Sequence, residues 1–348
     1  MTSNYPNPEQ DYTVLVRCFT FNQSKYIEDA LNGFVMQQTT FPFVCLVVDD
    51  ASTDGEQEVI KTWMERECDM ADAKYVDIPT ANVVIVPHKT NCNCTMAVYL
   101  LKENLYRQRE KKMDHVTPWR EHCRYEALCE GDDYWTEPLK LQKQVYFMNS
   151  HSEYSMCFHN AVLHWEDGRE EDHSFSNVKD RNYSGVEIFE KWIVPTASVL
   201  LRKEVYSSAI YRKAVKNPYF RYGDIILFLS CAKCGKVRGM SNCMSVYRKQ
   251  EGGVTYNVTT KYSIAHAFHS LNIYKEFGNE YKNLSVDFFM KTILNSYLMT
   301  RGDGNPQHKL LWSAFKVQPI ITIKFVWKRF FRKDYIKKFF WGDKTFIN

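Results

Sequence analysis

Short apolar runs alternate with segments of helical period along residues 12–135. The runs are rich in β-branched and aromatic side chains, which is typical of strands. The predicted strands are Tyr12–Phe19, Phe43–Val48, Asn82–Val86 and Tyr125–Cys129. The predicted helices are Tyr26–Gln38, a segment that carries Val59–Met64, and Val98–Arg109, which a charged stretch follows up to Glu121. This order predicts an α/β fold with a right-handed, mostly parallel sheet and flanking helices.

The pattern changes beyond Trp135. An amphipathic helix is predicted at Pro138–Asn149, and another helix is predicted to begin at Asp224. The further predicted strands are Tyr154–Trp165, Pro195–Arg202 and Lys236–Tyr247. From about Thr260 the sequence is helical in pattern and aromatic. We therefore expect a main domain over residues 1–255 and a helical C-terminal region over 256–348 that ends in a basic amphipathic tail.

Acidic side chains follow two of the predicted strands, as Asp49–Asp50 and within Glu130–Asp133. In parallel α/β sheets, ligands bind outside the carboxyl ends of the strands, where Phe19–Thr20 also falls. Clustered carboxylates repel one another, and a divalent cation removes that difficulty. Hard oxygen ligands suit Mg²⁺ or Mn²⁺ holding a phosphate-bearing substrate. The plainer alternative is a pair of solvated acidic loops. Two clusters at strand ends, one of them beside Tyr134–Trp135, favour a site.

The sequence lacks the common nucleotide-binding loops. The first predicted strand is not followed by Gly-x-Gly-x-x-Gly, and Gly-x-x-x-x-Gly-Lys is absent from the chain. Dinucleotide and P-loop sites are therefore disfavoured.

Charge is unevenly distributed along the chain. Residues 316–348 contain nine Lys/Arg and two Asp/Glu, a local net charge of +7, so residues 1–315 carry −3 of the total of +4. The total is too small to indicate nucleic acid as a partner. The tail interleaves cations with large aromatic residues. It is either an interfacial segment attracted to anionic lipid or a helix whose aromatic side chains pack on the main domain, and the first is favoured.

Features of secreted or membrane-spanning proteins are missing. Met1–Asp11 is polar, and no apolar run approaches the roughly 18 residues of a membrane span. The eleven cysteines lie mostly in apolar segments and form no disulfide framework. Cys231 and Cys234 have zinc-like spacing, but no second well-spaced pair completes a site. We expect a cytoplasmic protein, peripheral on the inner face of the plasma membrane.

Several motifs, in order, resemble the signature of family 2 glycosyltransferases. They are Phe21–Glu28, Val47–Gly55, Glu130–Trp135 with Lys140–Gln144, Tyr222–Asp224 and Tyr247–Val254. The second resembles the family's Asp-Asp-x-Ser-x-Asp, and the third its Asp-x-Asp region and Lys-Leu helix. The resemblance covers about residues 11–255, and the set of motifs is more specific than any one of them. It implies that the expected main domain, residues 1–255, is the catalytic domain.

The resemblance implies a GT-A fold, which is a Rossmann-like sheet with flanking helices, and inversion at the anomeric carbon. The residues it implies for a nucleotide-sugar donor are Phe19, Thr20, Asn22, Asp50, Asp132 and Arg248. The residues it implies for Mn²⁺ or Mg²⁺ are Glu130, Asp132 and Asp133, and such a cation stabilises charge on the departing nucleoside diphosphate. Asp224 is implied as the base that deprotonates the acceptor hydroxyl.

Some of these side chains have plainer alternatives. Asp54 is better explained as a carboxylate that complements a helix N-terminus. Asp224 could cap the helix that it opens, although its Tyr-Gly-Asp context favours catalysis. Arg248 pairs with a diphosphate or has a structural role, with equal weight. His159 lines an acceptor site or is an interior histidine.

The sequence therefore predicts a glycosyltransferase that moves a sugar from a nucleotide-diphosphate sugar, with a UDP-sugar favoured, to a hydroxyl of a glycan or lipid-linked acceptor. Cell-surface polysaccharide synthesis is the expected setting. The competing hypothesis is a non-catalytic nucleotide-sugar or glycan-binding module of an assembly complex. The joint presence of Asp50, Asp132, Asp133 and Asp224 favours the enzyme.

Overall fold

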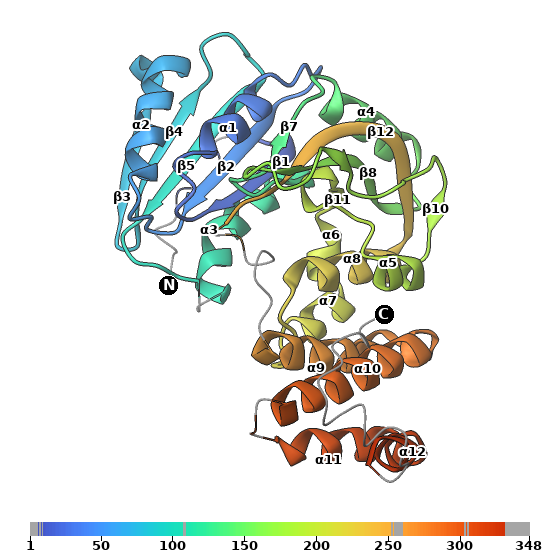
Figure 1. Cartoon of the computed structure of the whole chain (residues 1–348). Coiled ribbons are helices and arrows are strands. Elements are labelled where there is room, and N and C mark those ends of the chain that lie inside the picture. Colours follow the sequence, from blue (N-terminus) through green and yellow to red (C-terminus); the bar gives the residue numbers. More distant parts are fainter. Residues whose placement is uncertain are drawn as a thin grey trace. The chain divides into compact units, whose positions relative to one another are not determined.

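The computed structural model describes residues 6, 8, 10–106, 109–251, 253, 260–302, 304 and 306–330, with the side chains of 109–111, 260–262 and 329–330 excepted (Figure 1). The chain divides into two compact units. Unit 1 comprises Met1–Lys213 and Asp224–Tyr256, and unit 2 comprises Ala214–Gly223 and Asn257–Asn348. The assignment of catalysis to the first part stays a prediction.

Unit 1 is built on a mixed sheet with helices against it. Its strands are β1 (Tyr12–Thr20), β2 (Phe43–Asp49), β3 (Lys74–Ile78), β4 (Ala81–Pro87), β5 (Cys94–Leu101), β6 (Cys123–Leu128), β7 (Tyr134–Trp135), β8 (Tyr154–Trp165), β9 (His173–Ser174), β10 (Asn182–Tyr183), β11 (Leu200–Arg202) and β12 (Lys236–Lys249). Its helices are α1 (Ile27–Val35), α2 (Glu56–Glu67), α3 (Arg109–Glu121), α4 (Lys140–Ser150), α5 (Gly185–Lys191), α6 (Glu204–Ser207), α7 (Ala209–Ala214) and α8 (Gly223–Cys234).

The centre of the sheet is parallel, as the sequence predicts. The strand order is β10-β12-β8-β11-β6-β1-β2-β5-β4-β3, and the run β6-β1-β2-β5 is parallel throughout. β2 is buried along its whole length, which fits a parallel strand covered on both faces. Apolar side chains of α1, α2 and α4 pack on one face of the sheet, and those of α3 pack on the other. The carboxyl ends of β6, β1, β2 and β5 therefore meet at one edge.

One predicted element is wrong. Val98–Arg109 was expected to be a helix, but its first residues belong to β5, and the helix is α3, which begins at Arg109 and covers the charged stretch up to Glu121. β5 is apolar on both faces and buried along nearly all its length. A short run of this kind cannot be told from a buried helix by periodicity.

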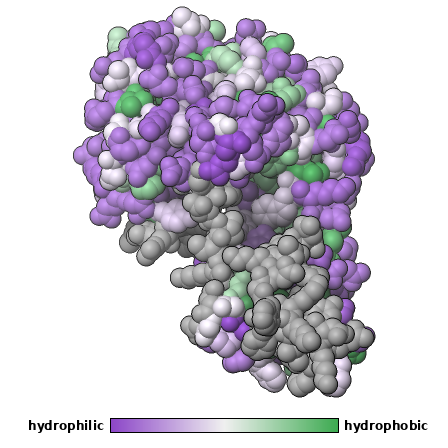
Figure 2. Space-filling model, viewed as in Figure 1, coloured by the Kyte–Doolittle hydropathy of each residue, from purple (hydrophilic) through white to green (hydrophobic). Residues whose placement is uncertain are grey.

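Two smaller differences concern strands. The predicted strand Pro195–Arg202 is a 3-10 turn at Thr196–Ser198 followed by β11. Asn82–Val86 does lie in a strand, β4, but β4 pairs antiparallel with β5 and with the unpredicted β3. β3 is mostly exposed and polar, so no apolar alternation marks it. In Figure 2 the visible surface over these elements is largely hydrophilic.

Unit 2 is helical in its described part. Its helices are α9 (Thr260–Phe277), α10 (Lys282–Gly302), α11 (His308–Val317) and α12 (Pro319–Phe330). α9, α10 and α11 bury a shared apolar core that includes Phe289, Ile293 and Leu310. Across the described residues, no helix combines the length and the apolar character needed to cross a bilayer. Of the predicted membrane-contacting tail, residues 316–330 are described, and residues 331–348 lie outside the described part.

Candidate active site

The loop that follows β1 and the loop that follows β6 approach each other closely at the carboxyl edge of the sheet. The Gly131 N–H donates to the Phe19 carbonyl at 3.1 Å. A β-carbon at Gly131 would lie 2.6 Å from Gln23 Oε1 and closer still to Thr20 Oγ1. Only glycine fits at this approach, so the chain after β6 is held against the end of β1.

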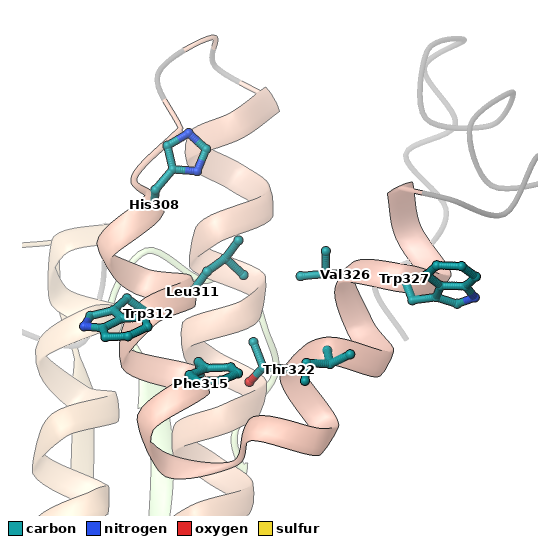
Figure 3. A pocket seen from close by; sticks show the side chains of 8 residues that line it. His308, Leu311, Trp312, Phe315, Thr322, Val326 and Trp327 are labelled. Carbon is teal, nitrogen blue, oxygen red and sulfur yellow. The ribbon is translucent and has the colours of Figure 1, made fainter.

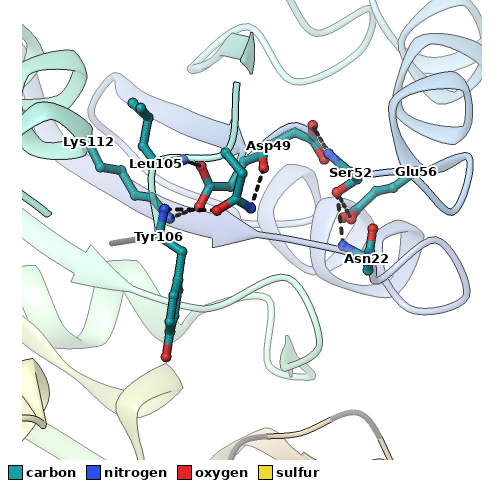
Figure 4. A network of polar contacts seen from close by, with 9 residues as sticks. Asn22, Asp49, Ser52, Glu56, Leu105, Tyr106 and Lys112 are labelled. Carbon is teal, nitrogen blue, oxygen red and sulfur yellow. Dashed lines mark hydrogen bonds and ion pairs between the residues drawn. The ribbon is translucent and has the colours of Figure 1, made fainter. Parts of the chain in front are cut away.

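A polar network ties the loop after β1 to the loop after β2 (Figure 4). Asn22, in the left-handed region at φ 54°, donates its N–H to Ser52 Oγ at 2.9 Å and accepts the Thr53 N–H at 2.8 Å. Glu56 Oε2 accepts from Ser52 Oγ and from the Gln23 N–H, each at 2.8 Å, and Glu56 Oε1 accepts from Thr20 Oγ1. Asn22 and Thr20, both implied for the donor, therefore also join the two loops.

Asp54 has the role that its plainer alternative described. Its carboxylate accepts the Glu56 N–H at 3.1 Å at the start of α2, and the Ser24 N–H at 2.9 Å. Burial raises the pKa of the neighbouring Glu56, while its hydrogen bond from Thr20 opposes that shift. The network orders the loops without directing Asp54 at a ligand.

Asp50 lies fully buried just past the end of β2 and is engaged by a lysine. Its Oδ2 is 2.5 Å from Lys112 Nζ on α3, and its Oδ1 accepts the Leu105 N–H at 2.6 Å (Figure 4). Lys112 Nζ also lies 5.2 Å from the centre of the Phe19 ring. Asp50, Phe19 and Lys112 thus form one group at the ends of β1 and β2.

Three carboxyl groups with raised pKa follow β6. Burial raises the pKa of Glu130 to about 7, with Asp132 adding to the shift and Arg17 opposing it. Burial also raises the pKa of Asp132, which accepts from Gln250 Nε2 at 3.3 Å. Buried carboxyl groups with raised pKa values have too little positive charge around them to stabilise the ionised form, so a cationic ligand is favoured there.

Asp133 and Arg248 are bound into the structure. Burial, with Asp132 beside it, holds the pKa of Asp133 well above its usual range, and Asp133 Oδ1 accepts the Arg248 N–H at 2.9 Å. The Arg248 guanidinium donates to Asp29 at 2.7 Å and lies 3.0 Å from Glu166. It also lies over the ring of Tyr26, at 4.6 Å. This is the structural alternative for Arg248, although its charge still lowers the pKa of Asp132.

Asp224 stands at the start of α8, half-buried. Its Oδ1 accepts the Ile225 N–H at 2.8 Å, which is the helix-capping alternative. Its charge also raises the pKa of Glu130, so the two carboxyl groups are close enough to interact. This interaction relates Asp224 to Glu130 among the carboxyl groups that follow β6.

Two of the three predicted metal ligands suit a cation that is shared with a substrate. Among the described residues, no group of three His, Cys, Asp or Glu side chains is arranged to hold a metal ion unaided. Mg²⁺ is usually bound through one or two carboxylates together with substrate phosphates. Glu130 and Asp132, whose raised pKa values a cation would reverse, fit that mode. Asp133 is directed to the backbone of β12 and fits it less well.

Two motif residues lie in the interior. Lys140 and Gln144 of the Lys-Leu helix are fully buried, with Lys140 Nζ donating to Gln144 Oε1 at 2.8 Å and lying 4.0 Å from the Trp135 ring. His159 is also fully buried, and burial holds its pKa well below its usual value. His159 is therefore an interior histidine.

Sequence reasoning missed the charged residues beneath the site. Arg17 on β1 pairs with Glu126 on β6 at 3.3 Å, and Arg120 donates to the same carboxylate at 2.6 Å. Glu126 has no exposed surface, and the two cations lower its pKa against the effect of burial. A signal was available, because Arg17 and Glu126 are opposite charges within neighbouring strands that are otherwise apolar. Lys112 lies in the charged stretch before Glu121, for which no helix was predicted.

The parallel centre of the sheet, with its polar groups at the carboxyl edge, is the GT-A fold of nucleotide-sugar glycosyltransferases. Staphylococcus aureus TarS, residues 1–349 in complex with UDP-GlcNAc, superposes with a TM-score of 0.52 at 15% identity, covering 82% of this chain and 73% of that one. The same TarS segment with UDP also gives 0.52, at 13% identity, covering 89% of this chain and 82% of that one. At this identity the likeness concerns the fold.

The relatives found by sequence share less than a third of their aligned residues with this chain. An uncharacterized protein of Mycobacterium tuberculosis is 29% identical over 242 residues, which are 69% of this chain. The match covers 60% of that relative, less than two thirds of its length. TuaG of Bacillus subtilis, named for glycosyl transfer in teichuronic acid biosynthesis, is 23% identical over 68% of this chain and 79% of its own length. No family model matches the chain.

Proposed function

We propose that this chain is a glycosyltransferase that moves a sugar from a nucleotide-diphosphate sugar, with a UDP-sugar favoured, to an acceptor hydroxyl with inversion. One observation carries the proposal. The carboxyl edge of a GT-A sheet gathers Thr20, Asp50, Glu130 and Asp132, and the charge of Asp224 acts on Glu130. TarS, with the same fold, binds UDP-GlcNAc and UDP, which supports a uridine nucleotide here.

The donor would lie along the ends of β1, β2 and β6. Phe19 and Asp50 would meet the base, and Asp132 the ribose. Lys112 is the cation nearest to Asp50, so it would either stay paired there or turn to the diphosphate. Glu130 and Asp132 would hold Mn²⁺ or Mg²⁺ together with the diphosphate, and the ion would supply electrostatic stabilisation of the leaving group. Arg248 would act through Asp133 and β12, and not as a direct ligand.

Asp224 would accept the proton of the acceptor hydroxyl. Asp224 is half-buried at a helix start, which suits a base that must meet a substrate. The acceptor would be a glycan or a lipid-linked glycan of a cell-surface polysaccharide. The name of TuaG supports such a product, and the basic C-terminal residues support a membrane surface nearby.

The first experiment is thermal stabilisation by UDP, GDP, CDP and TDP, each with and without Mn²⁺, followed by release of nucleoside diphosphate from matching donor sugars. Ligands that bind the native state raise the melting temperature, so UDP with Mn²⁺ should give the largest shift. Asp224→Asn should keep that shift and lose turnover by about 10²–10⁴-fold, the range of general-base catalysis. Asp69→Asn, which removes another helix-capping carboxylate, is the matched control and should keep turnover.

Three results would count against the proposal. Absence of a shift with every nucleotide would remove the donor site. Full turnover by Asp224→Asn would remove the assigned base. Nucleotide binding without transfer to any acceptor or to water would favour the binding module.

A further inference from the structure

The helices α11 and α12 carry large apolar side chains that are more than half exposed. On α12, Ile320 is 67% exposed, Ile323 56% and Trp327 64%. Trp312 on α11 is 59% exposed, and its ring stacks on Phe315. Exposed apolar patches of this kind are uncommon on soluble proteins and mark interaction surfaces.

The exposed residues of α12 form a stripe. Ile320, Ile323 and Trp327 are spaced by three and four residues, so they share one side of the helix. The side that faces the neighbouring helices carries Thr322, which is buried, and Phe325, which packs against the core of unit 2. The apolar stripe is therefore additional to what the fold of unit 2 requires.

An open groove lies between the two helices (Figure 3). Its volume is about 440 Å³, and its walls include Leu311, Phe315, Val326 and Trp327. The lining is almost entirely apolar. Such a groove suits hydrocarbon and offers little to a polar ligand.

Cations surround this apolar surface. Residues 306–330 contain five Lys/Arg and no Asp/Glu. Lys324 and Lys328 are exposed on the side of α12 next to the stripe, and Lys316 Nζ lies 5.5 Å from the Trp312 ring. Apolar and aromatic side chains flanked by lysines are the composition of helices that lie in the interface of anionic membranes.

Net charge indicates which of the possible binding partners this apolar surface favours. Residues 331–348 contain five Lys/Arg and two Asp/Glu, so that segment is itself cationic, and a second copy of the chain would present the same positive surface. Both would be repelled by residues 306–330. An anionic lipid surface is attracted to them, at about 1 kcal/mol for each lysine near the surface, or about fivefold in affinity.

We infer that α11 and α12 form a lipid-docking hairpin, in which Ile320, Ile323, Trp327 and Trp312 enter the interface of an anionic phospholipid bilayer and Lys316, Lys324 and Lys328 contact its headgroups. This deepens the proposed function, because a docked transferase meets a lipid-linked acceptor at the membrane. The hairpin is amphipathic, lies on the membrane surface and does not span the bilayer.

The test is co-sedimentation of the full chain with vesicles of phosphatidylglycerol mixed with phosphatidylcholine, and with vesicles of phosphatidylcholine alone. The wild type should bind the anionic vesicles, and salt should weaken the binding. Ile320→Ser/Ile323→Ser should weaken it at least tenfold, and Lys316→Gln/Lys324→Gln/Lys328→Gln roughly a hundredfold. Tyr75→Ser/Tyr146→Ser, which removes two equally exposed aromatic side chains of unit 1, should change nothing.

Other occupants give different results. A dimer in sedimentation velocity that the isoleucine variant dissociates, with vesicle binding absent or unchanged, would assign the surface to a second copy and overturn the inference. A lower melting temperature of that variant without vesicles, and no vesicle binding by the wild type, would assign it to residues 331–348. The UDP-dependent thermal shift is measured in parallel. If the wild type shows no UDP-dependent shift, the proposed function is contradicted and the lipid-docking hairpin is not. If the wild type does not bind anionic vesicles, the hairpin is contradicted and the proposed function is not.

Discussion

Replacing Lys112 with methionine should destabilise the folded chain more than any loss of a surface lysine. Lys112 Nζ lies 2.5 Å from Asp50 Oδ2, and the two side chains are 15% and 1% exposed. Methionine keeps the length and apolar stem of the side chain but removes the charge. The variant therefore leaves a buried carboxylate whose remaining described partner is the Leu105 N–H.

The expected cost follows from the geometry. Two unit charges 2.5 Å apart attract by about 7 kcal/mol at an effective dielectric constant of about 20. Desolvation of both groups offsets much of this attraction, and removal of one partner of a buried pair typically costs about 3–5 kcal/mol. Lys112 is partly exposed and the Leu105 hydrogen bond survives, so we expect about 3 kcal/mol. For a unit of this size, that lowers the melting temperature by roughly 6–12 °C.

The assay is a double-mutant cycle with Lys112→Met, Asp50→Asn and the combination, followed by urea unfolding. The combined loss should be smaller than the sum of the single losses by about 2 kcal/mol, because the pair can be broken once only. The control is Lys61→Met, since Lys61 Nζ lies 2.6 Å from Glu58 with both groups well exposed. That change should cost less than about 1 kcal/mol. Additive losses for Lys112 and Asp50 would refute the reasoning.

The remaining predictions concern single residues. Gly131→Ala should cost about 1–3 kcal/mol and weaken UDP binding, because the new methyl group meets Thr20; Gly302→Ala, where space is open, is the control in both assays. Burial raises the folded pKa of Glu130 to about 7, so this group makes the ligand-free protein less stable as pH rises from about 4.5 to 7. Glu130→Gln should flatten the melting temperature over that range, and an unchanged profile would contradict the assignment. Burial lowers the folded pKa of Lys140 to about 7, so its penalty grows as pH falls from about 10.5 to 7. Lys140→Met should therefore stabilise the fold by about 1–3 kcal/mol, and more at pH 6 than at pH 9 in denaturant titrations.

The elements that could be predicted from the sequence are those in which burial requires apolar residues in runs or at regular spacing. β1, β2, β6 and α1 fall where β-branched runs and helical spacing place them. α3 was missed because its residues are mostly charged, with Pro118 inside the helix, and only Met113, Val116 and Trp119 face the sheet at helical spacing. β3 was missed because an exposed edge strand needs no apolar alternation.

The edge of the sheet that carries the candidate site could also be predicted, because parallel strands place their carboxyl ends together. The partners of each side chain could not. Whether Asp50 faces a base or Lys112 depends on where α3 lies, and α3 was not expected. Arg248 has its partners on α1 and after β8, far away in the sequence, so its structural role emerges only from the folded chain.

The hydrogen bonds between the loop after β1 and the loop after β2 limit how these loops can be exchanged between related proteins. Glu56 is buried and accepts from the hydroxyls of Thr20 and Ser52 and from the backbone N–H of Gln23, so loss of either hydroxyl leaves the carboxylate short of a donor unless another position changes with it. Residues 20–24 and 51–56 should therefore be inherited as a set. A chimaera that receives one of these loops from a relative should fold poorly, whereas one that receives both should keep the network and carry the donor preference of the relative with it.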